Sequence, residues 1–193
     1  MTDDVYTVTE NRGGAAPRLL LHCCCAPCAS HVLECLSPQY QITVLFFNPN
    51  IQPRDEYDKR AGELKRLLSL ASYPNPVDMM VAGYDTGVFE SAVRLFTDEP
   101  EGGKRCRECF SLRLGEAAAF AKSGGYDRFS TTLTVSPHKP AEVINEVGTG
   151  LGNSYGVEYL HSDFKKRDGY KRSVELSKRY GLYRQQYCGC RYR

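Results

Sequence analysis

Cysteine is the residue type that gives this chain its most distinctive chemistry. The sequence of 193 residues contains nine cysteines, and eight of them form three short groups at positions 23–28, 106–109 and 188–190. Cys35 stands apart in an apolar stretch, which is typical of a small buried side chain without a chemical role. Thiols at this density need a chemical reason, and disulfides, structural zinc and an iron–sulfur cluster compete to provide it.

Disulfides are the weakest of the three hypotheses. Disulfide-dense proteins are usually small secreted domains, whereas this chain is long enough to bury a core of its own. Its start is polar and acidic and lacks the apolar run of a signal peptide. We therefore expect a cytoplasmic protein whose clustered thiols bind metal or catalyse. Its apolar runs are too short to cross a bilayer, so we expect no membrane partner.

The spacing of the thiols favours iron–sulfur over zinc. Cys25-x-x-Cys28 and Cys106-x-x-Cys109 can each bind one metal or one cluster. Compact zinc ribbons hold their pairs about 15–20 residues apart, but these pairs lie in distant parts of the chain. The thiols also outnumber the four ligands that a single zinc or a four-iron cluster requires. Zinc stays open as the second hypothesis, and dithiol–disulfide chemistry as the third.

A few other side chains have positions that suit chemistry. His138 follows a Ser-Pro pair at the expected end of a strand, and it is the best-placed histidine. Asp163 could bind a second metal or supply a proton, but it could equally cap the following helix. Tyr187 could donate a proton or simply pack. His22 most simply ends a strand as a core residue.

The segments that must position these residues alternate between strand and helix patterns. Such alternation is typical of a parallel sheet covered by helices. Apolar and β-branched runs predict five strands, at residues 18–22, 41–47, 77–81, 128–135 and 157–160. Amphipathic runs predict helices at residues 29–36, 54–70, 89–96, 110–122, 139–147 and 170–179. We expect a flexible segment at residues 1–17 and then one Rossmann-like α/β domain over residues 18–193.

Ligands of open α/β sheets bind at the carboxyl ends of the strands. The first cysteine group, residues 48–50 and residues 136–138 each follow a predicted strand directly. These three segments should therefore line one rim of the sheet, and we expect the cysteine-rich metal site to lie there.

The charge of the chain is distributed unevenly. From residue 165 to the C-terminus there are ten Lys and Arg against two acids, although the net charge of the whole chain is only +2. Five tyrosines lie among these cations. Basic and aromatic side chains together suit a polyanionic partner with unstacked bases, although a solvated basic helix would have the same composition.

The motifs at these positions resemble those of the QueH-type epoxyqueuosine reductases of tRNA queuosine biosynthesis. In chain order the matches are Leu-His-x-Cys-Cys-Ala-Pro-Cys at 21–28, Phe-Asn-Pro-Asn-Ile at 47–51, Glu56-Tyr57, Cys106-x-x-Cys109-Phe-x-Leu-Arg113, Ser-Thr-Thr-Leu-x-x-Ser-Pro at 130–137, Asp163-Phe-Lys-Lys166 and Tyr187-Cys-Gly-Cys190. They extend over nearly the whole chain, from about residue 18 to residue 190. Cys23 looks like an addition to the family's double cysteine, so Cys24 and Cys25 are the pair that carries over.

The resemblance implies reduction of the epoxide of epoxyqueuosine, at the wobble base of a tRNA anticodon loop, with electrons from an unidentified donor. It also implies a [4Fe-4S] cluster with an additional mononuclear iron beside it. The hypothesis assigns the cluster to Cys24, Cys106, Cys109 and one C-terminal cysteine, with Cys188 as our choice. The second metal would then take Cys25 and Cys190, together with Cys28 or Asp163. Asp163, His138 and Tyr187 are the candidate catalytic residues.

Two other functions remain open on the sequence alone. A tRNA sulfur-transferase-like enzyme would need a phosphate-binding loop after the first strand, and this chain has Cys-Cys-Cys-Ala-Pro-Cys there. A zinc-stabilised RNA-binding module without catalysis would be colourless, whereas thiolate-bound iron–sulfur centres are brown.

Overall fold

A computed structural model describes residues 15–192 and shows a five-stranded parallel sheet. The strands are β1 (Arg18–His22), β2 (Gln41–Phe46), β3 (Val77–Val81), β4 (Arg128–Thr131) and β5 (Glu158–Tyr159). They pair in the order β3-β2-β1-β4-β5, and every pair is parallel. The predicted fold class is confirmed. Parallel neighbours require crossovers, and helices supply them.

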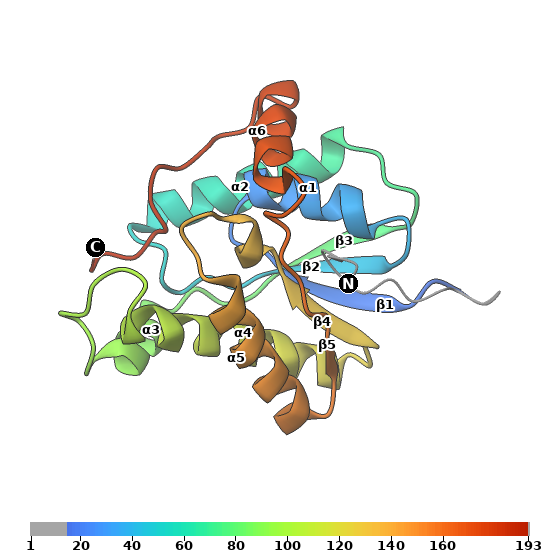
Figure 1. Cartoon of the computed structure of the whole chain (residues 1–193). Helices are drawn as coiled ribbons and strands as arrows, with labels where there is room; N and C mark the ends of the chain where they lie inside the picture. The colour runs from blue at the N-terminus through green and yellow to red at the C-terminus, as the bar shows by residue number, and fades with distance from the viewer. Residues whose placement is uncertain (1–14, 193) are drawn as a thin grey trace.

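Helices cover both faces of the sheet (Figure 1). On one face lie α1 (Ala26–Leu36), α2 (Arg54–Leu70) and α6 (Gly169–Arg179). On the other lie α4 (Lys104–Ser123) and α5 (Ala141–Tyr155), and α3 (Thr86–Val93) packs against α4. The alternation along β1 separates the two cores: Leu19 and Leu21 pack toward α1 and α2, whereas Leu20 packs toward α4. Because β1 is buried on both faces, its sequence contains a continuous apolar run.

Several boundaries differ from the prediction, and one difference concerns the cysteines. The second pair does not precede its helix, because α4 begins at Lys104 and contains both Cys106 and Cys109. These two residues are three apart on a helix, so their side chains share one face. The helix can begin directly after Gly102-Gly103, because residues 104–109 include no Gly or Pro that would interrupt it.

The predicted strand at 128–135 was too long. β4 ends at Thr131, and residues 132–135 form a 3₁₀ turn. The hydroxyl of Thr131 accepts a hydrogen bond from the backbone N–H of Leu133 at 3.2 Å. This local bond competes with continuation of the strand, as Thr side chains commonly do. The fifth strand is also shorter than predicted, with two residues.

The order of the strands reverses at β1. The chain moves from β1 outward through β2 to β3 and later returns to the other side of β1 with β4 and β5. Such a reversal leaves a crevice beyond the carboxyl ends of the two central strands. The first cysteine group follows β1, and residues 136–138 follow β4, so both border this crevice.

Two predictions about the chain as a whole need separate mention. Residues 1–14, most of the segment predicted to be flexible, lie outside the described residues, and the division into one domain from residue 18 stays a prediction. Among the described helices, none combines the length and the apolar composition needed to cross a membrane.

Candidate metal centre

A cavity of about 440 Å³ occupies the crevice between β1 and β4. Three segments supply most of its lining: the first cysteine group with the start of α1, the loop after the 3₁₀ turn, and the C-terminal segment. Its lining includes Cys24, Cys28, Arg113, Leu133, His138, Lys139, Tyr170, Arg184, Tyr187 and Cys188. The rim predicted from the sequence is thus the place where the cysteines, His138 and the C-terminal tyrosines meet.

A second, smaller cavity of about 30 Å³ adjoins the first. Four thiols line it, those of Cys106, Cys109, Cys188 and Cys190. Cys188, Arg113, His138 and Lys139 line both cavities. The second and third cysteine groups therefore come together although they are about eighty residues apart in sequence.

The three neighbouring cysteines after β1 face different ways. Cys23 packs among the residues between the sheet and α1. Cys24 and Cys25 pack instead with Phe110 and Leu114 of α4, and their sulfurs are 3.9 Å apart. Cys24 therefore lines the larger cavity and Cys25 lies beside it, whereas Cys23 lines neither cavity.

The six predicted metal ligands line or border these cavities without forming a ready ligand set. Within residues 15–192, no group of three or more His, Cys, Asp or Glu side chains is close enough to hold a metal ion. None of the nine cysteines, all of which lie within the described residues, forms a disulfide. The assignment of individual ligands stays a prediction.

Burial holds several of these thiols in their protonated form. A hydrogen bond with Cys25, followed by burial, raises the pKa of Cys24 well above its ordinary value. Burial raises the pKa of Cys109, and the neighbouring Arg113 opposes that rise. Burial also raises the pKa of Cys190 to about 11. Metal ligation would have to displace these protons, because the thiolate is the ligand.

Two buried arginines flank the thiols. Arg113 donates to the Cys109 sulfur at 3.8 Å and to Asn48 Oδ1 at 2.8 Å, and its Nε has no partner. Arg105 lines the small cavity and donates to the carbonyl of Thr97 at 2.9 Å; its Nε also has no partner. Neither guanidinium has a carboxylate within ion-pair distance among the described residues.

Buried cations without counter-ions are costly, so the two arginines suit anionic thiolates. Arg113 is four residues after Cys109 on α4, and this helical spacing was the sequence signal for their contact. Arg60 also lines the larger cavity but had no such signal, because it lies far from every cysteine pair in the sequence.

The candidate catalytic residues differ in their surroundings. His138 is exposed and lines both cavities. Tyr187 lines the larger cavity, but its hydroxyl donates to the carbonyl of Gln52 at 2.7 Å. Asp163 accepts from Lys165 Nζ at 2.8 Å and is not among the residues that line either cavity.

His22 is a core residue. Its ring is completely buried, with Nε2 3.1 Å from the carbonyl of Phe47 and Nδ1 2.9 Å from the hydroxyl of Thr131. A carbonyl can only accept, so Nε2 carries the proton and Nδ1 accepts from Thr131. Burial, and then the charge of Arg113, lowers the pKa of His22 well below its ordinary value. Both nitrogens are therefore committed within the neutral ring.

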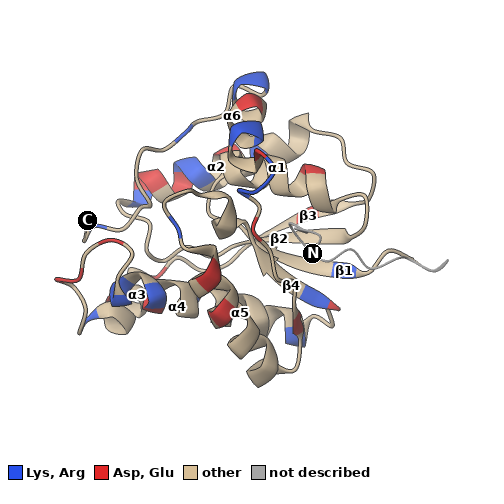
Figure 2. Cartoon of the chain, in the orientation of Figure 1, with Lys and Arg blue, Asp and Glu red and all other residues tan. Residues whose placement is uncertain are grey.

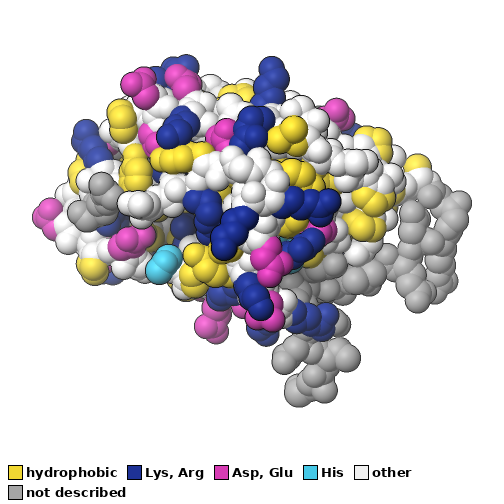
Figure 3. Space-filling model, turned by 90° about the horizontal axis from the view of Figure 1, so that it is seen from above, with side chains coloured by type: hydrophobic (Ala, Val, Ile, Leu, Met, Phe, Trp, Pro, Cys, Tyr) yellow, Lys and Arg dark blue, Asp and Glu magenta, His cyan; other side chains and the backbone are white. Residues whose placement is uncertain are grey.

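Positive charge gathers on α6 and the segment before it (Figure 2). Lys166, Arg167, Lys171, Lys178 and Arg179 are exposed there. Viewed from above, several groups of Lys and Arg side chains lie on this face, with acidic and hydrophobic side chains among them (Figure 3). The loop between α3 and α4, which contains Asp98, Glu99 and Glu101, is acidic. The basic C-terminal segment predicted from the sequence thus forms a basic surface at α6.

The sequence of the chain is similar to those of known proteins. The family model described as "Epoxyqueuosine reductase QueH" matches residues 19–193. The epoxyqueuosine reductase QueH of Streptococcus pyogenes serotype M1 is 46% identical over 178 residues, which cover 91% of this chain and 70% of that protein. The one from Staphylococcus epidermidis is 43% identical over 93% of this chain and 77% of its own length. The one from Thermotoga maritima is 36% identical, over 89% and 88%.

Proposed function

Because the chain belongs to the QueH family of epoxyqueuosine reductases, we propose that it reduces epoxyqueuosine at the wobble position of tRNA in the cytoplasm, on an iron centre held by its cysteines. The enzyme is an oxidoreductase. Membership of this family decides against the sulfur-transferase and the zinc module. The observation that carries the iron centre is the convergence of three cysteine groups on two adjoining cavities beside buried arginines that lack carboxylate partners.

The residues present fit a thiolate-bound iron centre. Four thiols surround the smaller cavity, and two more follow β1 at its border. Arg105 and Arg113 supply positive charge where thiolates would accumulate negative charge. We propose the cluster ligands Cys24, Cys106, Cys109 and Cys188, with Cys25 and Cys190 left for the additional iron. Cys188 is the C-terminal cysteine that lines both cavities, which supports its place in the first set.

The cavities also suggest a second division of the thiols. Cys106, Cys109, Cys188 and Cys190 line one cavity together, and Cys24 and Cys25 form a separate pair. Replacement of Cys24 with Ser distinguishes the two arrangements. A variant that keeps four irons and four sulfides per chain would assign the cluster to the four-thiol cavity, whereas loss of the cluster supports our division.

The larger cavity has the size and lining expected for a modified nucleoside. Binding sites of small molecules typically enclose about 300–1,000 Å³, and this cavity has about 440 Å³. Its walls include the cations Arg60, Arg113, Lys139 and Arg184 but the single acid Glu101. The exposed ring of Tyr170 lies at its edge and could stack on a base. A nucleotide displaced from an anticodon loop, with its phosphates, matches this surface.

Removal of the epoxide oxygen as water needs two electrons and two protons. When bound, an iron–sulfur cluster supplies single electrons, and an adjacent iron acts as a Lewis acid toward oxygen. His138 borders both cavities and can deliver a proton from its ring to the leaving oxygen. Tyr187 is worse placed for this, because its hydroxyl proton is bound to the carbonyl of Gln52. Asp163 remains a predicted ligand or proton donor.

The deciding experiment combines a colour, a metal count and a turnover assay. Protein reconstituted anaerobically with iron and sulfide should be brown and should convert epoxyqueuosine to queuosine in tRNA when a reductant is added. Cys106→Ser should lose most of its iron and sulfide together with this conversion. Cys35→Ser is the control, because Cys35 belongs to α1 and lines neither cavity. A colourless protein that still reduces the substrate would contradict the proposal.

A further inference from the structure

The C-terminal cysteines occupy a segment with no regular secondary structure. Residues 187–190, here called the C-terminal cysteine segment, belong to no helix or strand. Backbone hydrogen bonds within an element cannot fix the place of Cys188 and Cys190. Their position must therefore come from contacts with other parts of the chain.

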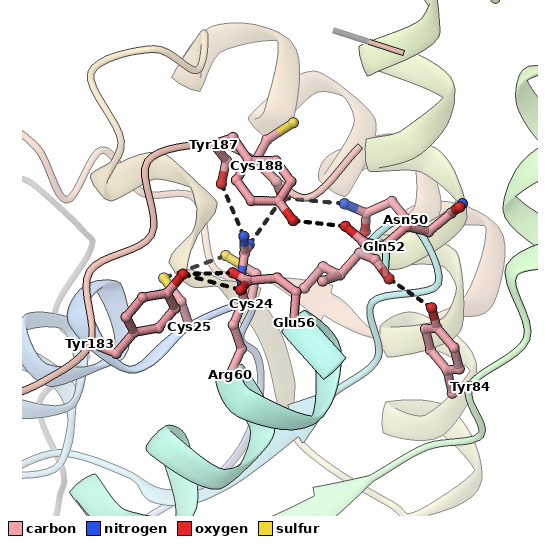
Figure 4. A network of polar contacts seen from close by, with 11 residues as sticks. Cys24, Cys25, Asn50, Gln52, Glu56, Arg60, Tyr84, Tyr183, Tyr187 and Cys188 are labelled. Carbon is pink, nitrogen blue, oxygen red and sulfur yellow. Dashed lines mark hydrogen bonds and ion pairs between the residues drawn. The ribbon is translucent and has the colours of Figure 1, made fainter. Parts of the chain in front are cut away.

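Those contacts converge on Arg60, a residue of α2. Its Nη2 donates to the carbonyl of Tyr187 at 3.1 Å, and its Nη1 donates to the carbonyl of Cys188 at 3.2 Å. The guanidinium carbon lies 5.1 Å from the centre of the Tyr187 ring. Figure 4 shows the side chain of Arg60 rising from α2 toward this segment. One planar group thus binds two successive carbonyls, which a rigid fork of donors suits.

Arg60 is itself fixed in place. Its side chain is only 1% exposed and pairs with Glu56 at 2.7 Å. Glu56 in turn accepts from the hydroxyl of Tyr183, at 3.2 and 3.1 Å to its two oxygens. A buried arginine whose three guanidinium nitrogens each have a partner loses little freedom in binding its acceptors. Its loss would leave two carbonyls without these donors.

The loop after β2 also holds the C-terminal cysteine segment. The backbone N–H of Gln52 donates to the carbonyl of Gly189 at 2.9 Å. Gly189 has φ +105, and a Cβ there would come within 2.7 Å of Ile51 Cγ1. The segment therefore lies directly against the loop, and only glycine permits this approach. Three successive carbonyls, of residues 187, 188 and 189, are held from outside the segment.

We propose that Arg60 is a positioning residue that holds Cys188 and Cys190 in the cavity wall beside Cys106 and Cys109. Only the identity of the group that these thiols bind rests on the proposed function. Arg60 acts through the carbonyls of the segment and contacts no cysteine sulfur through a described hydrogen bond. It sets where the third cysteine group lies before any metal is bound.

The test measures thiol accessibility in the metal-free protein. Each cysteine is alkylated with iodoacetamide, and the rate at each position is followed by mass spectrometry of peptides. In Arg60→Met, Cys188 and Cys190 should react about 10-fold faster, because loss of two hydrogen bonds frees the segment. Cys23, Cys24 and Cys35 should keep their parent rates.

Arg66→Met is the matched control. Arg66 also extends from α2, pairs with Glu63 at 2.9 Å and donates to the carbonyls of Tyr180 and Gly181 at 3.1 and 2.7 Å. It therefore holds the chain before the C-terminal cysteine segment but not the segment itself. Its replacement should leave the alkylation of Cys188 and Cys190 unchanged.

Two results would overturn the proposal. Unchanged rates at Cys188 and Cys190 in Arg60→Met would show that other contacts hold the segment. A similar acceleration at every cysteine, including buried Cys23, would show a general loss of stability. If Arg60→Met does not fold, Arg60→Lys decides by the same criteria, since lysine keeps the charge near Glu56 but cannot donate as a fork.

Iron content separates this proposal from the proposed function. Selective acceleration at Cys188 and Cys190, followed by reduced iron after reconstitution, supports both. Selective acceleration with full iron loading supports the positioning role of Arg60, and it removes these two cysteines from the iron centre.

Discussion

Arg113 interacts with one thiol from each of the first two cysteine groups. It lies among Cys24, Cys109 and Asn48 and lines both cavities. Burial lowers its pKa and the thiols raise it, with a net rise above its ordinary value. The guanidinium is therefore charged at every physiological pH. Its position gives thiolates a fixed positive partner in a site from which water is largely excluded.

We expect Arg113→Met to weaken iron binding by about 10-fold or more, in the range found when partners behind metal ligands are removed. The measurement is competition for iron with a chelator of known affinity. Arg107→Met is the control, because Arg107 lies on the same helix but pairs at the surface with Glu146. Equal iron affinity in Arg113→Met and the parent would show that Arg113 does not balance the charge of the thiolates.

Among the elements, α5 lies close against β5 of the sheet at Gly148. A Cβ on Gly148 would lie 2.4 Å from the ring of Tyr159 in β5, whereas a Cβ on Gly150 would meet nothing within 4 Å. The two glycines are two residues apart on one helix and so face different surroundings. Gly148 permits contact between helix and strand, and Gly150 contributes only flexibility.

Opposite effects are expected from the same substitution at these two positions. Gly150→Ala should raise the free energy of unfolding by up to about 1 kcal/mol through helix propensity. Gly148→Ala should lower it, because overpacking costs about 1–3 kcal/mol and outweighs that gain. Urea unfolding of both variants tests the pair, and stabilisation by both would refute the close contact of α5 with Tyr159.

An exposed ion pair ties α6 to α1. Arg172 binds Glu34 with a shortest distance of 2.6 Å. The hydrogen bond from Arg172 lowers the pKa of Glu34 below its ordinary value, and the charges of Arg172, His31 and Arg179 act in the same direction. Because the carboxyl pKa is lowered in the folded protein, the pair contributes fully to stability at pH values above the ordinary pKa of glutamate, about 4.3. That contribution is lost as the pH falls through the lowered pKa.

We therefore expect Glu34→Gln to be less stable than the parent at pH 7, by the about 0.2–1 kcal/mol typical of exposed pairs. The difference should disappear once the pH has fallen below the lowered pKa of Glu34, where both side chains are neutral. Urea unfolding across this range measures it. A difference that persisted in acid would indicate that the carboxamide disturbs packing instead.

At the scale of the molecule, the basic surface around α6 and the larger cavity lie in the same part of the structure. Tyr170 belongs to α6 and lines the cavity with Arg184. A tRNA bound across the cations could thus present one nucleotide to the cavity. Phosphate contacts release counterions, so binding of this kind weakens with salt.

Removal of charge at Lys165, Lys166 and Arg167 tests this surface. The triple Gln variant should bind tRNA more weakly, and its slope of log affinity against log salt should be smaller by up to about 2, as three lost contacts to single-stranded RNA predict. Lys65→Gln is a control on α2, outside this segment. Salt-independent binding of the parent would contradict the electrostatic account.

The amino-acid sequence by itself determined the chemical type of the site and the class of the fold. Cysteine spacing indicated metal ligation, and alternating apolar patterns predicted the parallel sheet, because both depend on residues close together in the chain. Local hydrogen bonding was harder to predict: the 3₁₀ turn after β4 depends on one threonine hydroxyl, and α4 begins before its cysteines.

Only the tertiary structure decided which thiols share a cavity and what holds them there. Cys106 and Cys188 line the same cavity, and Arg60 binds carbonyls 127 and 128 residues further along the chain. The C-terminal cysteine segment has no periodic pattern of its own, so its place is set by buried donors on α2 and the loop after β2. Such contacts arise when distant segments pack together, and no local pattern of residue types encodes them.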